Sequence, residues 1–573
     1  WVPLCAGGNP AHRPLPSYTF ALKHALGGLE PFGYPLVNLA IHLGNGWLVW
    51  WIAKRLLEEN GPARNAADGH GGEPVAWAGA AIWLVHPLVT QAVDYVYQRM
   101  ELLGATAILA TLACFLQARR SAHPRRWLAA SVAASGCGML CKETVVAAPA
   151  VVFLVDWLAG GRPPWRPWGA AVATLRRRPT FYAASAATLL VAVWVVAVQR
   201  ERFAELVEPV LPAWRYAINQ PLVILDYLRL AAWPAGLCLD RYRLPAADAR
   251  PLVAGMVAVA AALAIAVGSL GRRPRVALTM LLFFALLAPT SSLIPVNDLQ
   301  VDHRMYLPLA VLVVGTLAAV ASRVPPRAFA IGAVCGGAVL ALATHARSAV
   351  FASRLAAWRD VVTKAPANPR GRAILADELL RHGDAAAALV EVDASLAIEP
   401  RSARPHLLRS AILFALDRHE ESLAAARMAV EQNPRVAGGH VRVAAALVEL
   451  DRHPEAITAA RAALTVDAGD VPALRLLAEA LVWEGRDAEA LDACRRMFAL
   501  DPPDRPLHAA ADPRRHGLRF ATLAAALAGL RAGGAAAADE ETIDAALARA
   551  EAFDPSSPRT TRMRALALRR LGR

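Results

Sequence analysis

The sequence lacks the short patterns that identify several large protein classes. Its seven cysteines are scattered, and they show neither a disulfide framework nor the spacing of a zinc site. There is no glycine-rich phosphate loop, no HExxH pair and no serine nucleophile elbow, which argues against a nucleotide hydrolase or a protease. Charged residues make up only 19% of the chain. Its class must therefore be inferred from the apolar residues.

Long uncharged apolar runs occupy the first two thirds of the chain. The 573 residues are 56% hydrophobic with a mean hydropathy of +0.35, which is too apolar for a soluble protein of this size. The runs indicate a polytopic protein embedded in the lipid bilayer. The net charge of +14 comes largely from arginines in short loops between the runs. This pattern is typical of an inside-positive membrane protein and not of a nucleic-acid-binding protein.

The last third of the chain is a sequence repeat with a period of about 34 residues, which is the period of tetratricopeptide repeats. In these repeats, small residues let paired helices approach and a proline ends the second helix. An ordinary alanine-rich helical bundle is the competing interpretation. The repeated columns are Pro366, Pro400, Pro434 and Pro502, with Ala468 at the missing position; Gly383, Asp417, Asp451 and Gly485; Ala388, Ser422, Ala456 and Ala490; and Leu389, Leu423, Ile457 and Leu491.

Ten apolar segments before the repeats are predicted to cross the membrane. Basic clusters fall in alternate loops, so these loops are predicted to be cytoplasmic and the repeats non-cytoplasmic. Segments 127–141 and 144–158 are only roughly 22 Å long as helices, so a re-entrant hairpin is an alternative for them. Residues 214–236 carry charges and are interpreted as a helix lying on or dipping into the membrane. The ten segments are 34–57, 75–93, 102–118, 127–141, 144–158, 180–199, 251–270, 276–296, 304–322 and 328–346.

These patterns predict an all-α chain located in the inner (plasma) membrane, with its repeats outside the cytoplasm. The chain opens at Trp1 with no initiator methionine, and we expect it to lack its first membrane helix. The predicted parts are a polytopic membrane domain (1–347), a connector helix (348–365), four tetratricopeptide repeats forming an α-solenoid (366–502), and a loop with a degenerate capping repeat (503–573), whose helices are expected at 519–533 and 539–553.

Polar residues gather near the predicted outer ends of the apolar segments. His42 shares one helical face with Asn38 and Asn45, and this face must look toward the protein interior. Hydrogen bonding between helices is the competing interpretation. Arg99 and Glu101 suit a phosphate-bearing lipid and a proton acceptor. An interfacial anchor pair explains them equally well.

Two further motifs place charges between apolar runs. Lys142 and Glu143 lie in the string CKETV. Because a charge at mid-bilayer costs roughly 2.5–3.5 kcal/mol on insertion scales, this pair is either functional or part of a solvated turn. Asp302, His303 and Arg304 precede another apolar run. The planar guanidinium of Arg304 suits phosphate oxygens.

Four strings precede the repeats, in the order HRPLPSYTFALKHALGGLEPFGYPLVNLAIHLGN, VHPLVTQAVDYVYQRMELLGA, GMLCKETVVAAP and DHRMYLPLA. Together with the repeats, they resemble the transmembrane and tetratricopeptide repeat-containing O-mannosyltransferases of the GT-C superfamily, as a bacterial relative. The resemblance implies a GT-C-like membrane domain. It also implies transfer of a mannose-like sugar from a polyprenyl-phosphate carrier to a polypeptide acceptor on the non-cytoplasmic side.

The resemblance also implies roles for individual residues. A carboxylate activates the acceptor hydroxyl. The catalytic residues are expected to be Glu101, Glu143 and His86. The residues expected to bind the lipid phosphate are Arg99, Lys142, Arg304 and His303, with Asp302 and His42 in support.

Two departures from the family pattern bear on catalysis. The acidic residue expected in the first outer loop has no counterpart, because residues 1–33 contain only one acid, Glu30. Gln91 stands where relatives often carry a glutamate, and an amide cannot act as a base. No metal-ligand set and no cofactor is indicated, and metal dependence stays open. A non-catalytic membrane scaffold, whose repeats recruit a partner protein, is the alternative hypothesis.

Overall fold

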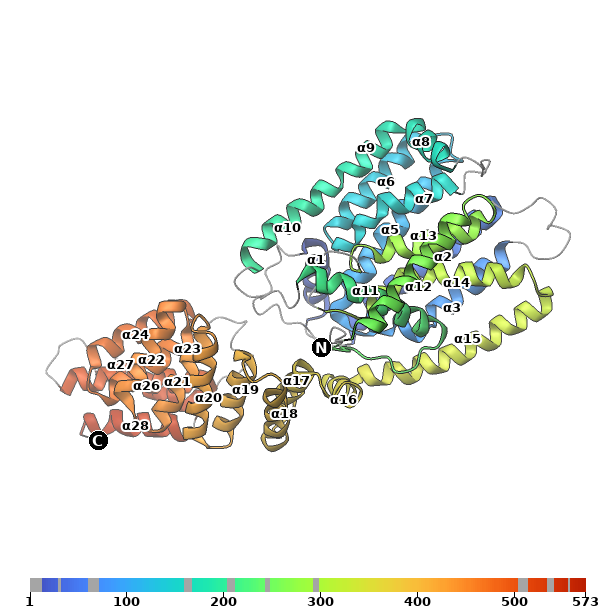
Figure 1. Ribbon diagram of the computed structural model, residues 1–573. Helices are drawn as coiled ribbons and strands as arrows, with labels where there is room; N and C mark the ends of the chain where they lie inside the picture. Colours follow the sequence, from blue (N-terminus) through green and yellow to red (C-terminus); the bar gives the residue numbers. More distant parts are fainter. Residues whose placement is uncertain are drawn as a thin grey trace. The chain divides into compact units, whose positions relative to one another are not determined.

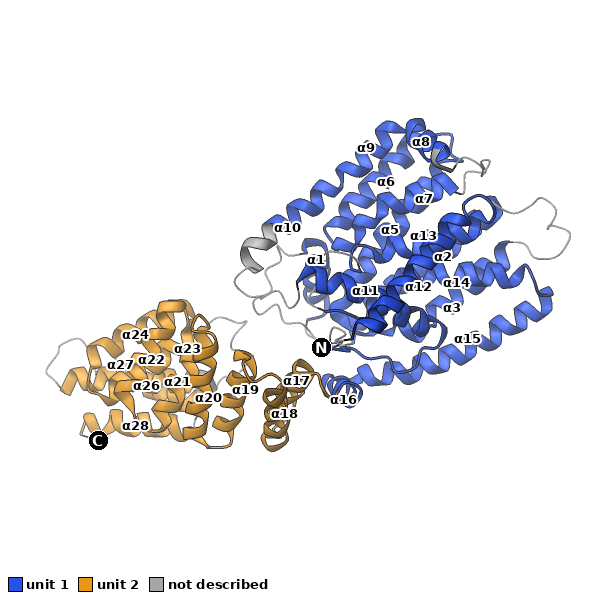
Figure 2. Ribbon diagram, in the orientation of Figure 1, with its two compact units in different colours: residues 1–365 blue, residues 366–573 orange. Residues whose placement is uncertain are grey.

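The computed structural model describes residues 13–28, 32–59, 72–158, 167–203, 212–242, 248–291, 298–502, 514–532, 540–554 and 557–572. Every regular element within these ranges is a helix (Figure 1), which confirms the predicted all-α fold. The chain divides into two compact units, unit 1 (Trp1–Ala365) and unit 2 (Pro366–Arg573), shown in different colours in Figure 2. Each unit is described separately below.

Unit 1 is a bundle of helices joined by short 3₁₀ turns. Its elements in chain order are α1 (Pro14–Gly27), α2 (Gly33–Glu59), α3 (Gly72–Leu84), η2 (Pro87–Val89), α4 (Thr90–Asp94), η3 (Val96–Gln98), α5 (Arg99–Ala118), α6 (Pro124–Met139), η4 (Glu143–Ala147), α7 (Ala148–Leu158), α8 (Pro167–Arg177), α9 (Pro179–Ala187), α10 (Leu189–Phe203), α11 (Ala213–Ala232), α12 (Ala249–Gly268), α13 (Pro274–Leu287), η5 (Asp302–Met305), α14 (Tyr306–Ala321), α15 (Pro326–Ser348), η6 (Ala349–Ala352) and α16 (Arg354–Lys364).

Five helical stretches in the described ranges are long and apolar enough to cross a membrane, and α3 with the segment Pro87–Asp94 makes a sixth if this pair, bent by 53°, is one span. The structure thus supports fewer full-length spans than the ten predicted. The other predicted runs fold as shorter helices, such as the 14-residue α13, and a span needs about 20 residues. The five stretches are Gly33–Glu59, Val96–Ala118, Ala249–Gly268, Asp302–Ala321 and Pro326–Ala352.

Helix α15 shows why unit 1 needs a lipid environment. Only 6% of its most apolar window is buried inside the protein. The exposed fractions of its large side chains Ile331, Val334, Val339 and Leu342 are 64%, 71%, 66% and 72%. A continuous apolar surface of this kind is stable against hydrocarbon and not against water. Unit 1 is therefore the membrane-embedded part of an integral membrane protein.

Helix α11 corresponds to the segment that we interpreted as lying on the membrane. It is amphipathic and contains Pro221. Its buried face, which includes Tyr216, Val223 and Tyr227, belongs to the core of unit 1. The predicted connector also differs in detail, because Ser353 separates η6 from α16 and caps the latter by accepting a hydrogen bond from the Ala356 amide.

Unit 2 is an α-solenoid of helix pairs that recur with the period of the sequence repeat. The first helices are α17 (Pro369–Arg381), α19 (Ala403–Ala415), α21 (Ala437–Glu449) and α23 (Val471–Trp483). The second helices are α18 (Ala385–Ile398), α20 (His419–Gln432), α22 (His453–Val466) and α24 (Asp487–Leu500).

The turn within each pair has the same backbone geometry. Gly383, Asp417, Asp451 and Gly485 all have positive φ, at 84°, 57°, 56° and 71°. The amide after each turn residue donates back to a leucine carbonyl, as from Arg486 to Leu481 at 2.9 Å. This is the Schellman motif, in which a left-handed residue ends the helix and satisfies its last carbonyls. The repeated turn explains why the sequence period is so regular.

The end of unit 2 contains more helix than the sequence predicts. Helix α26 (Arg514–Ala532) begins inside the predicted loop 503–518, and α27 (Glu540–Phe553) matches the expected second helix closely. An unpredicted third helix, α28 (Pro558–Arg570), follows. It packs against α26 and forms ion pairs with earlier repeats. The turn expected at residues 533–534 and the proline at 555 lie outside the described residues.

We predict that Gly485→Ala lowers the stability of unit 2 by about 1–2 kcal/mol, because an alanine pays the full left-handed backbone cost. A Cβ at Gly485 would meet nothing within 4 Å, so no clash contributes. Gly485→Asp should cost clearly less, because aspartate tolerates this conformation and occupies it at Asp417 and Asp451. Denaturant unfolding of residues 366–573, which have their own core, measures both. Equal losses for the two substitutions would contradict this explanation of the turn.

Candidate active site

The polar face of α2 lies inside the bundle and contacts α14. The His42 Nδ1 atom accepts from the Tyr306 hydroxyl at 2.7 Å, and Nε2 donates to the Leu84 carbonyl at 3.1 Å. Asn45 donates to the same hydroxyl at 3.2 Å and to the Leu102 carbonyl at 3.1 Å. Both ring nitrogens of His42 are thus engaged within the protein. The structure shows His42 as a link between α2 and α14, and its supporting role at the site stays a prediction.

Arg99 lies at the start of α5 and is completely buried. Its Nε donates to Asn38 Oδ1 at 2.9 Å, and Nη2 donates to the Tyr34 carbonyl at 3.0 Å. The guanidinium also stacks over the Phe20 ring, 4.1 Å from its centroid. These contacts join α1, α2 and α5. The structure therefore shows a bridging role for Arg99, and phosphate binding by this residue stays a prediction.

Glu101 and Lys142 form a buried ion pair. The Lys142 ammonium contacts the Glu101 carboxylate, and the exposed fractions of the Lys142 and Glu101 side chains are only 6% and 9%. Gly104 permits this approach, because a Cβ there would lie 3.3 Å from the Cβ of Lys142. The pair links α5 to the segment before η4. Each charge stabilises the other away from water, and the catalytic role of Glu101 and the phosphate role of Lys142 stay predictions.

Glu143 follows Lys142 but has a different environment. Its side chain is 49% exposed, and its carboxylate accepts from Arg13 Nη2 at 2.8 and 3.1 Å. Desolvation opposes its ionisation, but the charges of Arg13 and Lys142 outweigh this effect and lower the pKa of Glu143 below its ordinary value. Glu143 is therefore an ionised carboxylate that solvent can reach.

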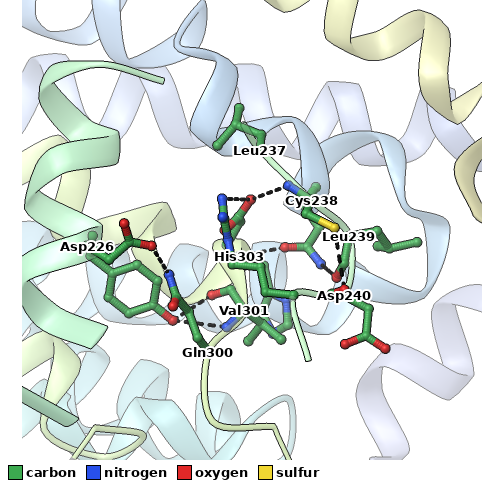
Figure 3. A network of polar contacts seen from close by, with 12 residues as sticks. Asp226, Leu237, Cys238, Leu239, Asp240, Gln300, Val301 and His303 are labelled. Carbon is green, nitrogen blue, oxygen red and sulfur yellow. Dashed lines mark hydrogen bonds and ion pairs between the residues drawn. The ribbon is translucent and has the colours of Figure 1, made fainter. Parts of the chain in front are cut away.

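The segment before α14 is held by a network of hydrogen bonds (Figure 3). The His303 amide donates to Gln91 Oε1 at 2.8 Å, and Gln91 Nε2 donates to the Leu239 carbonyl at 2.8 Å. The Asp302 carboxylate accepts from Arg241 Nε at 2.8 Å and from the Cys238 amide at 3.2 Å. Gln91 thus acts as a structural link, Asp302 holds Arg241 and the Cys238 amide, and its supporting role at the site stays a prediction.

The His303 ring contains an unsatisfied polar atom. Its Nδ1 is buried and has no hydrogen-bond partner among the described residues. The positive charges of Lys142, Arg304 and Arg13 all act on this ring. Lys142 and Arg13 are themselves paired with Glu101 and Glu143, and Arg304 donates to a backbone carbonyl. The His303 Nδ1 atom therefore lies near cations that already have partners, and phosphate binding by His303 stays a prediction.

Arg304 is engaged with the backbone around it. Nη2 donates to the Asp298 carbonyl at 2.7 Å, and Nη1 lies within 3.3 Å of the Leu299 carbonyl and the Tyr216 hydroxyl. The side chain is 6% exposed. A planar guanidinium with several fixed donors suits this task of holding a loop. The structure shows that role, and phosphate contact by Arg304 stays a prediction.

His86 caps the short helix η2. Its Nδ1 accepts from the Leu88 amide at 3.1 Å, and its Nε2 lies 3.2 Å from the Ala231 carbonyl, to which it donates. Because both nitrogens already have backbone partners, proton transfer at His86 would first require one of these bonds to break. The catalytic role predicted for His86 is untested, and its geometry is that of a structural cap.

The structure brings three of the predicted motifs together. Glu101 contacts Lys142, and His303 is influenced by Lys142 and by Arg13. Arg13 and Arg241, which contact Glu143 and Asp302, are not among the residues predicted from the sequence. Both lie in segments predicted to face outward, where arginine is less frequent than in cytoplasmic loops. The presence of arginine in these outward-facing segments is the sequence signal that could have identified both residues. In the described part of the chain, no cluster of three or more His, Cys, Asp or Glu side chains could hold a metal ion.

These features define a helical membrane protein with a polar site in its bundle and a tetratricopeptide-type solenoid. No protein-family model matches the chain. It is similar to the protein O-mannosyl-transferase Tmtc1 of Drosophila melanogaster (31% identity, 27% of this chain and 16% of that protein). Similar matches are Tmtc3 of Drosophila melanogaster (36%, 24% and 16%) and human TMTC2 (31%, 26% and 17%). The chain thus matches only about a sixth of the length of these relatives.

Two of the solved structures that are similar to parts of the chain are tetratricopeptide-repeat proteins. YrrB, described as having an unusual peptide-binding site, is 16% identical over 38% of this chain and 98% of its own, with a TM-score of 0.28. TTC0263 of Thermus thermophilus is 22% identical over 33% of this chain and 94% of its own, with a TM-score of 0.26. The assignment of repeats in unit 2 rests on its own helices and turns.

We predict that Lys142→Met alone lowers the stability of unit 1 by about 3–5 kcal/mol, because it leaves Glu101 as an uncompensated buried charge. Adding Glu101→Gln should restore most of the loss. Thermal unfolding in detergent, together with abundance in the membrane, measures both variants. A single variant as stable as the wild type would show that the pair is not needed for the fold.

Proposed function

We propose that this protein is a membrane glycosyltransferase with a GT-C-like membrane domain. It transfers a mannose-like sugar from a polyprenyl-phosphate carrier to a protein acceptor, and unit 2 holds the acceptor. The similarity to O-mannosyl-transferases supports this class. The observation that carries the proposal is the convergence of Arg13, Lys142, Glu143 and His303, which combines cations with an accessible carboxylate.

The cations provide a place for the carrier's phosphate. Lys142 is already neutralised by Glu101, whereas Arg13 faces the half-exposed Glu143. A phosphate group between Arg13 and the His303 ring would meet positive charge in a partly desolvated site, where charge-assisted hydrogen bonds are strong. The unpartnered His303 Nδ1 becomes a donor to phosphate when this nitrogen carries the proton.

Glu143 is the candidate base in this arrangement. The acceptor hydroxyl oxygen forms a bond to the anomeric carbon as the bond from that carbon to the phosphate oxygen breaks. The hydroxyl proton passes to the carboxylate, and the polyprenyl phosphate leaves with the electron pair. Of the three residues predicted to be catalytic, Glu143 is the most exposed, because Glu101 and His86 are buried with partners.

We predict that Glu143→Gln reduces sugar transfer at least about 100-fold, because removing a general base typically costs 10²–10⁴-fold. Transfer of radiolabelled mannose from a polyprenyl-phosphate donor, in membranes with matched protein abundance, is the measurement. Glu73→Gln is the matched control, because Glu73 is also a half-exposed acid paired with one base, Lys54. Normal turnover by the Glu143 variant would remove this residue from the mechanism.

The pH profile provides a second test of the same residue. Because the folded pKa of Glu143 is below its ordinary value of 4.5, the carboxylate is ionised and competent above that pH. Transfer should be lost only as the pH falls through this lowered pKa. Arg13→Gln removes one cause of the lowering and should move the acid limb of the profile upward. An unchanged limb in that variant would contradict the proposed pairing.

We also propose that the protein lies in the inner (plasma) membrane with unit 2 on the non-cytoplasmic side, because basic clusters mark the opposite loops as cytoplasmic. A cysteine introduced at the exposed position Arg418 should react with an impermeant thiol reagent on intact cells, and one at Arg177 should not. The reverse pattern would invert the topology. Labelling at neither position before lysis would place both on the cytoplasmic side.

The scaffold hypothesis is favoured by one observation, namely that Arg99 and Arg304 use their donors within the protein. In that case the motif residues maintain the fold only. A wild-type protein that captures a partner through unit 2 but transfers no sugar from any polyprenyl-phosphate donor would support the scaffold over the enzyme.

A further inference from the structure

A groove of about 1430 Å³ runs along the first helices of the four repeats in unit 2. One column of its lining recurs once in each repeat and consists of Ile374, Leu408, Arg442 and Leu476. Three of these four positions are apolar, as expected for a surface on which side chains pack. The third repeat places a guanidinium in the same position, so Arg442 is a departure that the fold does not require.

Arg442 has no counter-charge among the described residues. In the described part of unit 2, no ion pair or hydrogen bond reaches the Arg442 side chain. Partial burial lowers the pKa of its guanidinium. Arg475, also in the groove lining, contrasts with it. Arg475 Nη1 lies 3.0 Å from Glu479, four residues further along the same helix. The residue four positions after Arg442 is Ala446. A partly buried, unpaired charge destabilises the free protein and is relieved by a carboxylate.

The rest of the groove favours a polypeptide as the source of that carboxylate. Leu407, Leu408 and Val441 provide apolar contacts beside Arg442, and the exposed Arg404 adds a second cation nearby. Arg559, at one end of the groove, is already paired with Glu449 at 3.1 Å and Glu479 at 2.6 Å. The lining also contains carboxylates, of which Asp377 and Asp501 are paired with Arg381 and Arg519. Arg442 and Arg404 are lining arginines that form no ion pair among the described residues.

We propose that this groove binds an acidic segment of the acceptor polypeptide, with a Glu or Asp carboxylate on Arg442 and neighbouring apolar side chains against Leu408 and Val441. The identification of the bound polypeptide as the acceptor rests on the proposed function. Its acidic character is inferred from the groove itself. It predicts that acceptors are selected by an acidic segment that also carries apolar side chains.

The test uses the full chain in detergent and three fluorescent twelve-residue peptides. The peptides share a Gly, Ser and Leu framework and differ at four positions, which are all Glu, all Gln or all Lys. Wild-type protein should bind the Glu peptide most tightly and the Lys peptide least. Arg442→Leu should weaken binding of the Glu peptide about 10- to 100-fold, the range of a hydrogen bond to a charged group, and should leave the Gln peptide unchanged.

Arg442→Leu restores the apolar residue of its column, so the thermal stability of unit 2 should be kept or raised, and lost binding cannot be attributed to unfolding. Arg495→Leu makes the same change of charge at an exposed position of α24 outside the groove lining and should retain the preference for Glu. Equal binding of the three peptides, binding of none, or an unchanged preference in Arg442→Leu would overturn the inference. So would an equally Arg442-dependent, equally tight complex with a single-stranded oligonucleotide, which would assign the groove to nucleic acid.

The peptide measurements contain no sugar donor, so they are independent of catalysis. Selective binding of the Glu peptide without sugar transfer from any donor would overturn the proposed enzyme and keep the groove assignment. Transfer that depends on Glu143, combined with charge-independent peptide binding, would do the opposite.

Discussion

The rest of unit 1 depends on one constraint, namely that polar groups inside an apolar bundle must find their partners within the protein. Water cannot satisfy these groups, and an unpaired buried charge is costly. The Glu101–Lys142 ion pair meets this requirement between α5 and the segment before η4. Arg99 meets it with Asn38 and the Tyr34 carbonyl. Each such contact joins elements that are distant in sequence, so the same contacts that satisfy the polar groups also fix how the helices pack.

Some polar groups remain accessible to solvent or lack a partner. Glu143 keeps an accessible carboxylate beside its arginine partner, and the buried His303 Nδ1 lacks a partner among the described residues. In unit 2, Arg442 stands in an apolar column without a carboxylate. Most buried polar groups in a stable fold have partners, but Trp50 Nε1 and Gln98 Oε1 also lack one among the described residues. A missing partner is therefore evidence for a ligand only together with a groove or an accessible charge, as at Arg442.

The sequence predicts the repeats well because their determinants are local. A left-handed turn residue and a small residue five positions later act within one helix pair, so Gly383 with Ala388 is recognisable from spacing alone. The partner of each charged residue in unit 1 is not recognisable in this way. Pairing of Arg13 with Glu143 joins residues 130 positions apart and depends on how the helices pack. The sequence predicts which residues belong to a motif. It does not predict whether the side chain of such a residue already has a partner within the protein.

The arginines at positions 99 and 304 show that membership of a motif does not by itself define the role of a residue. A lysine could neutralise one charge, but only a guanidinium offers several donors in a fixed plane. Arg304 uses that plane to hold the Asp298 and Leu299 carbonyls and the Tyr216 hydroxyl at once. The structural task therefore already explains arginine at this position without a bound phosphate. Glu143 also has a structural contact, the ion pair with Arg13, but its side chain stays half-exposed and its carboxylate ionised. The proposed role of Glu143 as a base requires both of these properties, and the buried Glu101 lacks the first of them.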